Sequence, residues 1–561
     1  MIDFIPPGLI LILAGIVLRY LNFRAQKILL ISAPLICLIL IMQMPEGASL
    51  NYSFLEFKLN LIEVNKLSKL FGIIFGIMAL GGAIFSLNSN KKNELACAFI
   101  YSGSALGVCF AGDLITMFIF WEIMAIGSTL VIWNGNSTKS KDAGIRYALV
   151  HFFGGVVLMI GIIGQIFDTG NVDFVVIQAD TWFRWMILIG FLINAGAWPI
   201  SSWIADAYPE SSYTGMVFLS AFTTKTAVFV LIKSFPGTDI LIYIGLFMVF
   251  YGIIYALLEN DMRRILAYSI VNQVGFMITA IGIGTEMALN GAAAHAFAHI
   301  IYKALLLMSA GSVLFMTGKS KCTDLGGLFR TMPVTTICGI IGALAISAFP
   351  LTSGFISKSM ISQGAADQHL TYVWLLLTAA SAGVFLHAGI KFPWFVFFQK
   401  DSGLRPPDPP LNMKLAMIIF SLLCIGLGAY PSILYSFLPF NVDYVPYTSA
   451  HVVTQLQLLL FAGLAFFILL PQMKRTLTIS LDTDWLFRKL FIKIINYITK
   501  DLNYLINGIK HGTPEQLSSI IQQIVQYHGP QGLLAKNLPT GRTIFWVGII
   551  FSLFLILVLF T

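Results

Sequence analysis

Charged residues are scarce in this chain of 561 residues, of which Asp, Glu, Lys and Arg make up only 11%. Soluble domains carry about 25% charged residues. So few charges cannot cover the surface of a water-soluble globule of this size. Hydrophobic residues make up 57% of the chain, and Phe alone contributes 46 of them. Lipid must therefore be the solvent for much of the protein.

The chain also lacks the motifs that bind common cofactors. Its six cysteines are scattered and no two form a CxxC pair, so neither an iron–sulfur cluster nor a structural zinc site is expected. No GxGxxG or GxxxxGK(S/T) run marks a nucleotide site. The net charge of +8 is assigned to membrane-flanking loops, because no Lys- and Arg-rich run in a polar fold indicates nucleic acid. We therefore expect no cofactor, no metal and no nucleic-acid partner.

Apolar runs of about 17–25 residues recur along most of the chain, which predicts an all-α polytopic membrane protein with about fourteen to sixteen transmembrane helices. The first run has no basic segment before it and no small-residue cleavage site, so we expect an uncleaved helix rather than a signal peptide. The runs lie at 6–22, 28–45, 68–88, 95–111, 114–133, 146–168, 181–205, 213–234, 238–258, 264–283, 288–316, 334–362, 371–391, 412–433, 453–471 and 543–560.

Positive charges collect in alternate loops. The loops after odd-numbered runs carry most of the Lys and Arg, for example Lys91 with Lys92 and Arg263 with Arg264. The positive-inside rule places such loops in the cytoplasm. We therefore expect a multi-pass protein of the cell inner (plasma) membrane with its N-terminus outside.

Two runs are interrupted by proline or glycine. The seventh contains NAGAWPISSW with Pro199, and the twelfth contains AISAFPLTSGFISKS with Pro350 and Gly354. Such breaks are tolerated where the freed backbone groups line protein or a polar cavity. Because the breaks lie five runs apart, they predict two inverted five-helix repeats with a site near the midplane.

The runs divide the chain into six expected segments. Amphipathic spacing of Leu486, Leu490, Ile494 and Ile498 predicts a helix lying along the cytoplasmic surface. The segments are N-terminal helices at 1–90, a first repeat at 91–262, a second repeat at 263–392, further helices at 393–472, the amphipathic lateral helix within 473–542, and a last span at 543–561.

Two ionisable residues lie near the middle of apolar runs. An ionisable group in hydrocarbon costs about 2.5–3.5 kcal/mol even on mild scales, so each requires a partner, a water-filled cavity or a function. Glu122 lies in the fifth run without a basic neighbour in sequence, and Lys225 lies in the eighth. Proton translocation is one interpretation of both. The alternatives are a packing ion pair or a protonated acid for Glu122, and a static counter-charge to Glu122 for Lys225.

The eleventh run carries three titratable residues at regular spacing. His295, His299 and Lys303 follow one another at intervals of four residues, which places them on one helix face. A row of such groups is what a proton relay requires, and histidine exchanges protons near neutral pH. A zinc site at the two histidines is disfavoured, because no third ligand is evident.

Further basic residues extend this set. Lys358 follows the break in the twelfth run, where it is either buried near freed carbonyls or directed outward. His387 and Lys391, one turn apart in the next run, either continue a path to water or lie at the interface. His151 has no titratable neighbour in its run and is interpreted as a packing residue.

Six segments, taken in order, resemble one family. They are FIFWEIMAIGS, AWPISSWIADAYPESS, LSAFTTKTAVFVL, NDMRRILAYSIVNQVGFM, AHAFAHIIYKALLLMSAGSV and PLTSGFISKSM. They resemble the antiporter-like proton-conducting subunits shared by respiratory complex I, membrane hydrogenases and Mrp-type cation/proton antiporters, most of all the D subunit of the Mrp type. The resemblance covers roughly residues 90–390, and DTDWLFRK with the lateral helix also looks like C-terminal features of that group.

The resemblance implies roles for residues of this chain. Glu122 corresponds to the fifth-helix glutamate, Lys225 to an eighth-helix lysine, and Lys358 to the twelfth-helix lysine. His295, His299 and Lys303 correspond to the eleventh-helix relay. One position departs from the pattern, because Asn194 stands where the family commonly has a seventh-helix lysine. Replacement by Lys225, a different conduction route and a supporting role without conduction all remain open.

The expected function is that of a proton-translocating subunit in a multisubunit monovalent cation (Na⁺)/proton antiporter. One alternative is a proton-pumping subunit of an NADH:quinone oxidoreductase or membrane hydrogenase, in which case the chain would be part of an enzyme. The other alternative is a non-transporting scaffold or carbon-uptake partner. In each case the expected partners are other membrane subunits, the lipid bilayer, protons and, for the antiporter, Na⁺.

Overall fold

The computed structural model describes residues 5–472 except 55, single residues between 482 and 499, and residues 514–528 and 540–560. Within this part, helices dominate and one antiparallel pair of strands is present. Twelve of the described helices are long and apolar enough to cross a membrane. Each of the sixteen predicted runs coincides with a helix or a pair of helices. The expected all-α polytopic membrane protein is therefore confirmed.

The N-terminal part contains three helices and a hairpin of two strands that the sequence analysis did not expect. Strands β1 and β2 pair antiparallel within the polar stretch between the second and third runs. Lys233 forms an ion pair with Glu63 of β2, with 2.7 Å between Nζ and Oε2. The elements are α1 (Pro7–Leu18), α2 (Phe23–Gln43), β1 (Ser49–Phe54), β2 (Phe57–Glu63) and α3 (Lys66–Phe85).

The first set of helices after α3 includes two interrupted spans. The seventh run is divided into α7 and α8 around Pro199, as predicted, and the eighth is divided into α9 and α10 around Ser220–Phe222, where no proline or glycine signals a break. The elements are α4 (Lys92–Phe110), α5 (Leu114–Trp133), α6 (Thr138–Thr169), α7 (Trp182–Ala195), α8 (Ser202–Ala207), the 3₁₀ turn η1 (Tyr208–Glu210), α9 (Gly215–Leu219) and α10 (Thr223–Ser234).

The second set is also interrupted twice. The twelfth run is divided into α14 and α15 around Pro350, and the thirteenth passes from α-helix into the π-helical segment η4. The elements are α11 (Ile240–Leu258), α12 (Met262–Ile283), α13 (Glu286–Thr317), η2 (Cys322–Asp324), η3 (Leu328–Arg330), α14 (Pro333–Ile346), α15 (Ser353–Asp367), α16 (Thr371–Val384), η4 (Phe385–Lys391) and a second π-helical segment, η5 (Trp394–Phe398).

The two sets share helix lengths and end signals. Helices α6 and α13 have 32 residues each, and α7 and α14 have 14 each. The fifth and tenth runs both begin at an aspartate N-cap, Asp113 or Asp261, whose carboxylate accepts from backbone N–H groups and so fixes the helix start. Both 32-residue helices end at a glycine with positive φ, Gly170 or Gly318. We propose from these matches that the second repeat begins at α11, one helix earlier than the expected boundary at 262.

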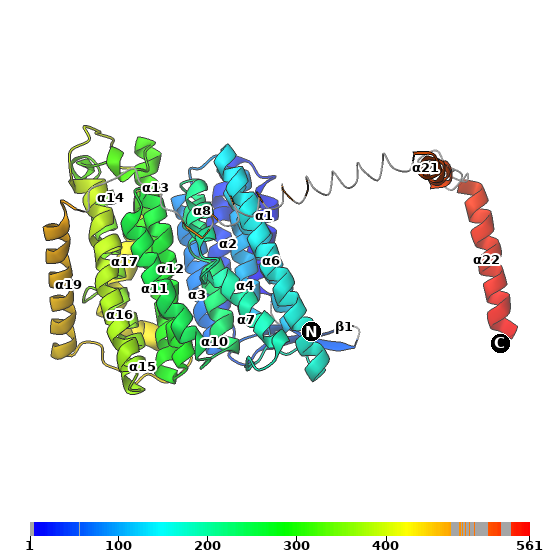
Figure 1. Ribbon diagram of the computed structural model, residues 1–561, viewed down its shortest axis with the longest axis horizontal. Coiled ribbons are helices and arrows are strands. Elements are labelled where there is room, and N and C mark those ends of the chain that lie inside the picture. Colours follow the sequence, from blue (N-terminus) through cyan, green and yellow to red (C-terminus); the bar gives the residue numbers. More distant parts are fainter. Residues whose placement is uncertain are drawn as a thin grey trace. The chain divides into compact units, whose positions relative to one another are not determined.

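Helix α13 occupies the centre of the larger folded unit, Met1–Asp484. It packs against α12, α14, α15 and α17 of its own half and against α3 and α10 of the other half. Figure 1 shows these helices running side by side. At about 1.5 Å per residue, 32 residues span about 48 Å, which exceeds the hydrocarbon core of about 30 Å. Side chains at mid-length of α13 are therefore deep in the protein.

The C-terminal helices complete the described chain. They are α17 (Leu411–Ala429), α18 (Pro431–Tyr435) and α19 (Ser449–Leu469) in the larger unit, and α21 (Pro514–His528) and α22 (Thr540–Phe560) in the second unit, Trp485–Thr561. Helix α22 corresponds to the predicted last run. The residues that predict the lateral helix, Leu486, Leu490, Ile494 and Ile498, lie outside the described residues.

Candidate functional site

A row of titratable side chains lies on α13, as the sequence spacing predicts. His295, His299 and Lys303 are all 0% exposed. None of them takes part in an ion pair among the residues that the structure describes. The neighbouring helices instead supply polar neutral groups, so that a change of charge in the row is not blocked by a fixed counter-ion.

His295 joins α13 to the helices on both sides. Its Nδ1 lies 2.9 Å from Ser357 Oγ of α15, and its Nε2 lies 3.1 Å from Gln273 Oε1 of α12. Because an amide oxygen only accepts, the hydrogen of the neutral ring lies on Nε2 and Nδ1 is the acceptor. Tyr302 donates to the same Gln273 oxygen at 3.0 Å. These contacts hold the ring in one orientation at one end of the row.

His299 is the least constrained member of the row. Neither of its ring nitrogens has a hydrogen-bond partner among the described residues. Its ring lies edge-on to Tyr302, with 5.2 Å between centroids, and 6.3 Å from the ring of His295. Both nitrogens are therefore available to take up or release a proton.

The lysines of the site bind neutral oxygens rather than carboxylates. Lys303 Nζ donates to Ser269 Oγ at 2.8 Å. Lys225 Nζ donates to the carbonyl of Ser220 at 2.6 Å, and Lys358 Nζ donates to the carbonyl of Ile346 at 2.7 Å. Ser220 lies in the break between α9 and α10, and Ile346 is the last residue of α14. Each helix break thus supplies a carbonyl that has lost its helical partner to a buried amine.

His387 and Lys391 lie on η4, and both are buried. His387 Nδ1 lies 2.9 Å from the carbonyl of Gly383 in its own helix. Lys391 Nζ donates to the carbonyls of Ala256, Leu257 and Glu259 at 2.6–3.0 Å, which are the last carbonyls of α11 and its flank. Lys391 therefore has the contacts of a cation that caps a helix C-terminus.

Glu122 and Lys225 are not joined by an ion pair in the described structure. The Glu122 carboxyl group instead lies against α6, because a Cβ added to Gly155 would collide with its Oε1. Asn194, at the end of α7, is fully buried and bonds to His151, with 2.7 Å between Asn194 Oδ1 and the ring Nδ1. His151, which the sequence analysis assigned to packing, is thus brought to the position that departs from the family pattern.

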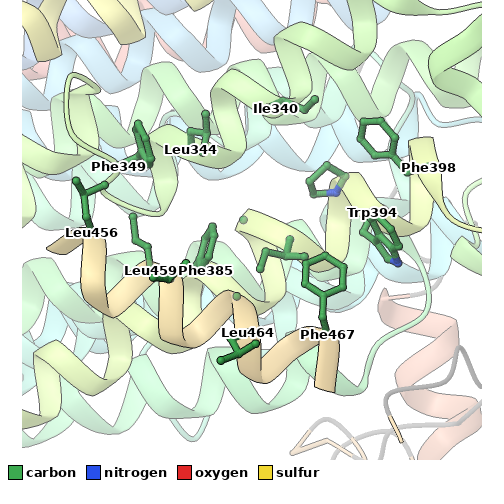
Figure 2. Close-up of a pocket in the computed structure, with 15 residues that line it drawn as sticks. Ile340, Leu344, Phe349, Phe385, Trp394, Phe398, Leu456, Leu459, Leu464 and Phe467 are labelled. Atoms are coloured by element: carbon green, nitrogen blue, oxygen red, sulfur yellow. The ribbon is translucent and has the colours of Figure 1, made fainter. Parts of the chain in front are cut away.

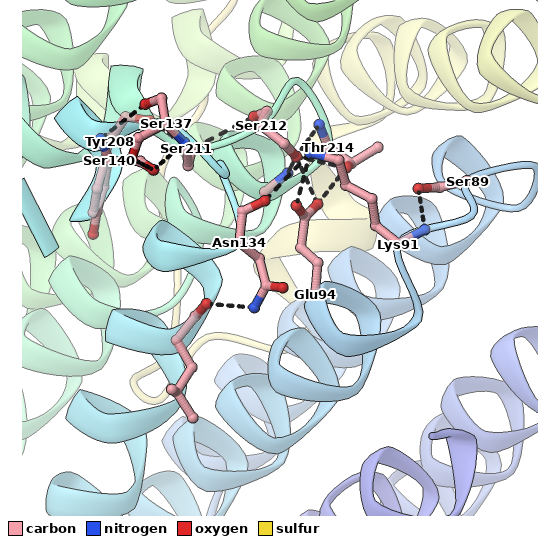
Figure 3. Close-up of polar contacts among 12 residues, drawn as sticks. Ser89, Lys91, Glu94, Asn134, Ser137, Ser140, Tyr208, Ser211, Ser212 and Thr214 are labelled. Carbon is pink, nitrogen blue, oxygen red and sulfur yellow. Dashed lines mark hydrogen bonds and ion pairs between the residues drawn. The ribbon is translucent and has the colours of Figure 1, made fainter. Parts of the chain in front are cut away.

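Sequence reasoning missed a buried carboxylate at one end of the bundle. Glu94, in the first turn of α4, is 1% exposed and accepts from the hydroxyls of Ser212 at 2.6 Å and of Thr214. Figure 3 shows both hydroxyls and Lys91, whose Nζ is 3.7 Å from Glu94, directed at this carboxylate. Glu94 directly precedes the fourth predicted run, and Glu94 with the paired Lys91 resembles an ordinary flanking charge in sequence.

The loop that receives Glu94 is also bound from the second half of the molecule. Arg263, in the first turn of α12, donates to the carbonyls of Pro209, Ser211 and Ser212 at 2.7–3.0 Å. The loop connects the two broken spans of the first set, so Arg263 fixes that connection to the start of the tenth run. Its burial could not be deduced from the sequence, because the positive-inside rule already explains Arg263 as an ordinary positive charge in a cytoplasmic loop.

Asp482 is a second buried carboxylate that the sequence analysis did not assign. It accepts hydrogen bonds from the hydroxyls of Tyr251 in α11 and Tyr268 in α12, the latter at 2.7 Å. Asp482 therefore contacts the helix pair that begins the second set. A separate cavity of about 650 Å³ is lined by apolar side chains of α14, η4, η5 and α19, among them Leu344, Trp394 and Leu459 (Figure 2). Without charged or hydroxyl groups, this cavity suits hydrocarbon and not ions.

Comparisons with known proteins identify membrane subunits that this chain resembles. The family model described as NADH:quinone oxidoreductase/Mrp antiporter, TM matches residues 111–385, which contain every predicted site residue outside η4 and none of the C-terminal helices. The chain is 30% identical over 59% of its length to a probable K⁺/H⁺ antiporter subunit of the A/B type from Rhizobium meliloti, but covers only 36% of that protein. It is 24% identical to the Na⁺/H⁺ antiporter subunit of the D type from Alkalihalophilus pseudofirmus, over 65% of this chain and 78% of that one.

A solved structure has the same fold. In the structure of the Mrp complex from Dietzia sp. DQ12-45-1b, one chain matches this one with a TM-score of 0.75 and 19% identity, over 93% of this chain and 61% of that one. The chain thus spans about a third of the first relative and less than two thirds of this structural neighbour. Residues 111–385 of the chain thus match the family model of NADH:quinone oxidoreductase and Mrp antiporter membrane subunits, and the fold is that of a chain of the Mrp complex.

Proposed function

We propose that this chain is the proton-translocating membrane subunit of a multisubunit monovalent cation (Na⁺)/proton antiporter. The observation that carries the proposal is the row His295, His299 and Lys303, which is buried at the centre of the membrane protein without a counter-ion among the described residues. Groups of this kind are costly in a membrane interior and mark ion or proton pathways. The named relatives include a Na⁺/H⁺ antiporter subunit, which supports the choice of exchange reaction.

The spacing of the row makes its charges mutually dependent. Side chains one turn apart on a helix lie about 6 Å from each other at Cβ. At an effective dielectric constant of about 20, two positive charges at that distance repel by about 3 kcal/mol, several times the thermal energy. Neighbouring carriers therefore do not hold a proton charge at the same time. A proton that arrives at one member favours departure from the next, which is what stepwise transfer requires.

The proposed route continues from the row in both directions. Lys225 on α10 lies on the side of the first repeat, and Lys358 on α15 lies on the side of the twelfth-run break, since both helices pack against α13. Protons would enter through one half of the molecule, pass Lys225, His295, His299, Lys303 and Lys358, and leave on the opposite side. A membrane potential of 100 mV supplies about 2.3 kcal/mol for each charge that crosses, enough to drive export of another cation.

Orientation and partners follow from loop charge and from the kind of complex proposed. Lys and Arg after the odd-numbered runs support an inner-membrane protein with its N-terminus outside. The chain would assemble with other membrane subunits, because both the proposed exchange and the redox alternative use several chains.

The first prediction concerns the row itself. Lys303→Met keeps the length and apolar stem of the side chain but removes the ammonium group, and we expect at least a tenfold loss of Na⁺/H⁺ exchange. Exchange is measured as dye-reported pH change in vesicles that contain the whole complex, after an imposed Na⁺ gradient. Lys27→Met is the matched control, because Lys27 bonds to Asn88 on an exposed part of the N-terminal helices.

Unchanged exchange in correctly assembled Lys303→Met complexes would contradict the proposed function. Proton movement that appears in the native complex only when an electron donor is added, and not with a cation gradient, would assign the chain to the redox alternative.

The second prediction separates a helix cap from a proton carrier at Lys391. Arginine donates several hydrogen bonds, so it can replace a lysine that caps a helix. It keeps its proton in proteins, so it cannot replace a lysine that carries protons. We expect Lys391→Arg to keep near-normal exchange. Lys391→Met leaves three carbonyls without a donor and should lower the unfolding midpoint of the purified complex, at a cost of about 1–3 kcal/mol. Loss of exchange in a stable Lys391→Arg complex would place Lys391 in the proton route.

The third prediction concerns orientation. A cysteine introduced at Lys141, in a background without reactive cysteines, should be labelled by a membrane-impermeant maleimide only after the cytoplasmic face is exposed, because Lys141 belongs to an odd-numbered loop. Labelling of intact cells from the outside would show the opposite orientation.

A further inference from the structure

Helices α6 and α13 match residue by residue. Their N-cap residues Ser137 and Thr285, their C-terminal glycines Gly170 and Gly318, and the preceding caps Asp113 and Asp261 are each 148 positions apart (137 and 285, 170 and 318, 113 and 261). The isolated strand bridges from those caps, to Asp173 and to Lys321, keep the same interval (173 and 321). The two helices therefore occupy equivalent places in the two sets.

With the same interval, three residues of α6 occupy the positions equivalent to the row of α13. His151 corresponds to His299, and Tyr147 corresponds to His295 (151 and 299, 147 and 295). Gly155 corresponds to Lys303 (155 and 303), so the first set has a glycine where the second has an amine. The space left by that missing side chain holds the carboxyl group of Glu122, since a Cβ at Gly155 would collide with Oε1. Glu122 thus lies one helical turn along α6 from His151.

The contacts of His151 leave one nitrogen free. Asn194 Oδ1 is 2.7 Å from Nδ1, and because this oxygen only accepts, Nδ1 carries the hydrogen of the neutral ring. Nε2 then has a lone pair, and it has no partner among the described residues. The ring is 1% exposed and lies between Tyr147 and Trp203, with 4.0 Å and 4.5 Å between centroids. Aromatic faces of this kind also stabilise a positively charged ring.

The break in the seventh run produces this arrangement. Asn194 is the penultimate residue of α7, and Trp203 lies in α8 on the other side of the break. The Trp203 indole N–H donates to the carbonyl of Ile193 at 3.1 Å, next to Asn194. Both side chains that hold the His151 ring are therefore positioned by one interruption, as Ser357 is positioned beside His295 by the break before α15.

We propose that His151 is the proton carrier of the first repeat, exchanging its proton with Glu122, and that Asn194 is the residue that positions the imidazole. This inference rests on the proposed function. In the forward step the Glu122 carboxylic acid gives its proton to Nε2, which leaves a carboxylate and an imidazolium with hydrogen on both nitrogens. The reverse step restores both neutral groups. The two charges that form are opposite in sign and one turn apart, so they stabilise each other.

The other charged groups around His151 are already engaged. Asp206 of α8 is paired with Arg146 at 2.7 Å. Arg184 of α7 is paired with Asp168 and Asp180, each at 2.7 Å. Glu210, at the end of η1, and Tyr208 are the remaining titratable groups of the elements that pack on this part of α6. Lys225 is held by Ser220 and Thr224 and forms no ion pair with Glu122 in the described structure. Glu122 instead lies against Gly155, one turn from His151 on α6, which favours His151 as its proton partner.

The test uses the whole complex in vesicles, with Na⁺/H⁺ exchange followed across pH 6–9. His151→Gln keeps a polar side chain that can bond to Asn194 but does not titrate, and we expect at least a tenfold loss of exchange. His451→Gln is the matched control, because His451 also bonds through Nδ1 to a neutral oxygen, Pro446 O at 2.8 Å, and stacks on an aromatic ring, Phe355. Its exchange should be unchanged.

Rescue distinguishes a proton carrier from a packing residue. A lysine at position 194 reaches the place of the ring, so His151→Gln with Asn194→Lys should recover at least a third of native exchange. Its pH profile should move to higher pH, because an amine holds its proton to higher pH than an imidazole. The same Asn194→Lys change should not rescue Lys225→Ala. For the positioning role, Asn194→Asp, which keeps the acceptor oxygen, should retain exchange, and Asn194→Leu should lose it.

The outcomes separate the two proposals. Normal exchange in His151→Gln complexes, while Lys303→Met complexes are inactive, would overturn the role of His151 and leave the proposed function intact. Rescue of Lys225→Ala by Asn194→Lys, without rescue of His151→Gln, would transfer the role to Lys225. Normal exchange in each of the single variants His151→Gln, Lys225→Ala and Lys303→Met would overturn the proposed function and this inference with it. The absence of exchange in the native complex would do the same.

Discussion

The structure depends on how buried amines are accommodated in the membrane when no carboxylate pairs with them among the described residues. Lys225, Lys358 and Lys391 each bind main-chain carbonyls at the end or break of a helix, and Lys303 binds a serine hydroxyl. A carbonyl dipole stabilises an ammonium group less strongly than a carboxylate would. After the lysine loses its proton, however, the neutral amine can still donate a hydrogen bond to the same carbonyl oxygen. Helix breaks therefore serve a chemical purpose here. They provide fixed oxygens around groups that must be able to exist with and without a proton.

Helices α6 and α13 have the same length and the same end signals, but they carry different titratable groups at equivalent positions. In α13 the positions four residues apart carry two histidines and a lysine, so the second set provides three groups that gain positive charge. In α6 the same positions carry Tyr147, His151 and Gly155, and the glycine admits Glu122 from α5. At these equivalent positions the first set thus places a carboxylate and an imidazole, and the second set places only basic groups. Tyr147 bonds to Thr223 at 3.3 Å, next to Thr224, which Lys225 contacts, so neighbouring polar groups connect α6 to Lys225 on α10, the helix of the first set that packs against α13.

Most helices and the main row could be predicted from the sequence, because apolar runs and a four-residue spacing are local properties. Pro199 and Pro350 likewise signalled two breaks. The break at Ser220–Phe222 carries no such residue, and the sequence analysis did not expect the π-helical segment at Phe385–Lys391. The hairpin of β1 and β2 lies in a stretch where polar and apolar residues alternate, as in SLNYSF and FKLNL, a strand signal that a search for long apolar runs passes over.

The role of His151 was hidden for a related reason. A lone histidine in an apolar run has no local partner, and its interpretation as packing followed from that. Its partners Asn194 and Trp203 come from the two sides of a broken helix more than forty residues away, and the space for Glu122 exists because residue 155 is glycine. Only the repeat, seen through equal spacing of caps and terminal glycines, relates His151 to His299. Glu94 and Asp482 were missed because their burial depends on loops and on a C-terminal segment that fold back onto the helices.

The central claim is that protons pass along the row of α13. His299→Leu tests it most directly, because neither ring nitrogen of His299 has a hydrogen-bond partner among the described residues and leucine leaves the helix packing nearly unchanged. The measurement is proton flux under an imposed membrane potential in vesicles that contain the complete complex, compared at equal amounts of assembled protein. The account predicts that the variant assembles and unfolds like the native complex while its proton flux falls at least tenfold. Native flux in the His299→Leu complex would contradict it.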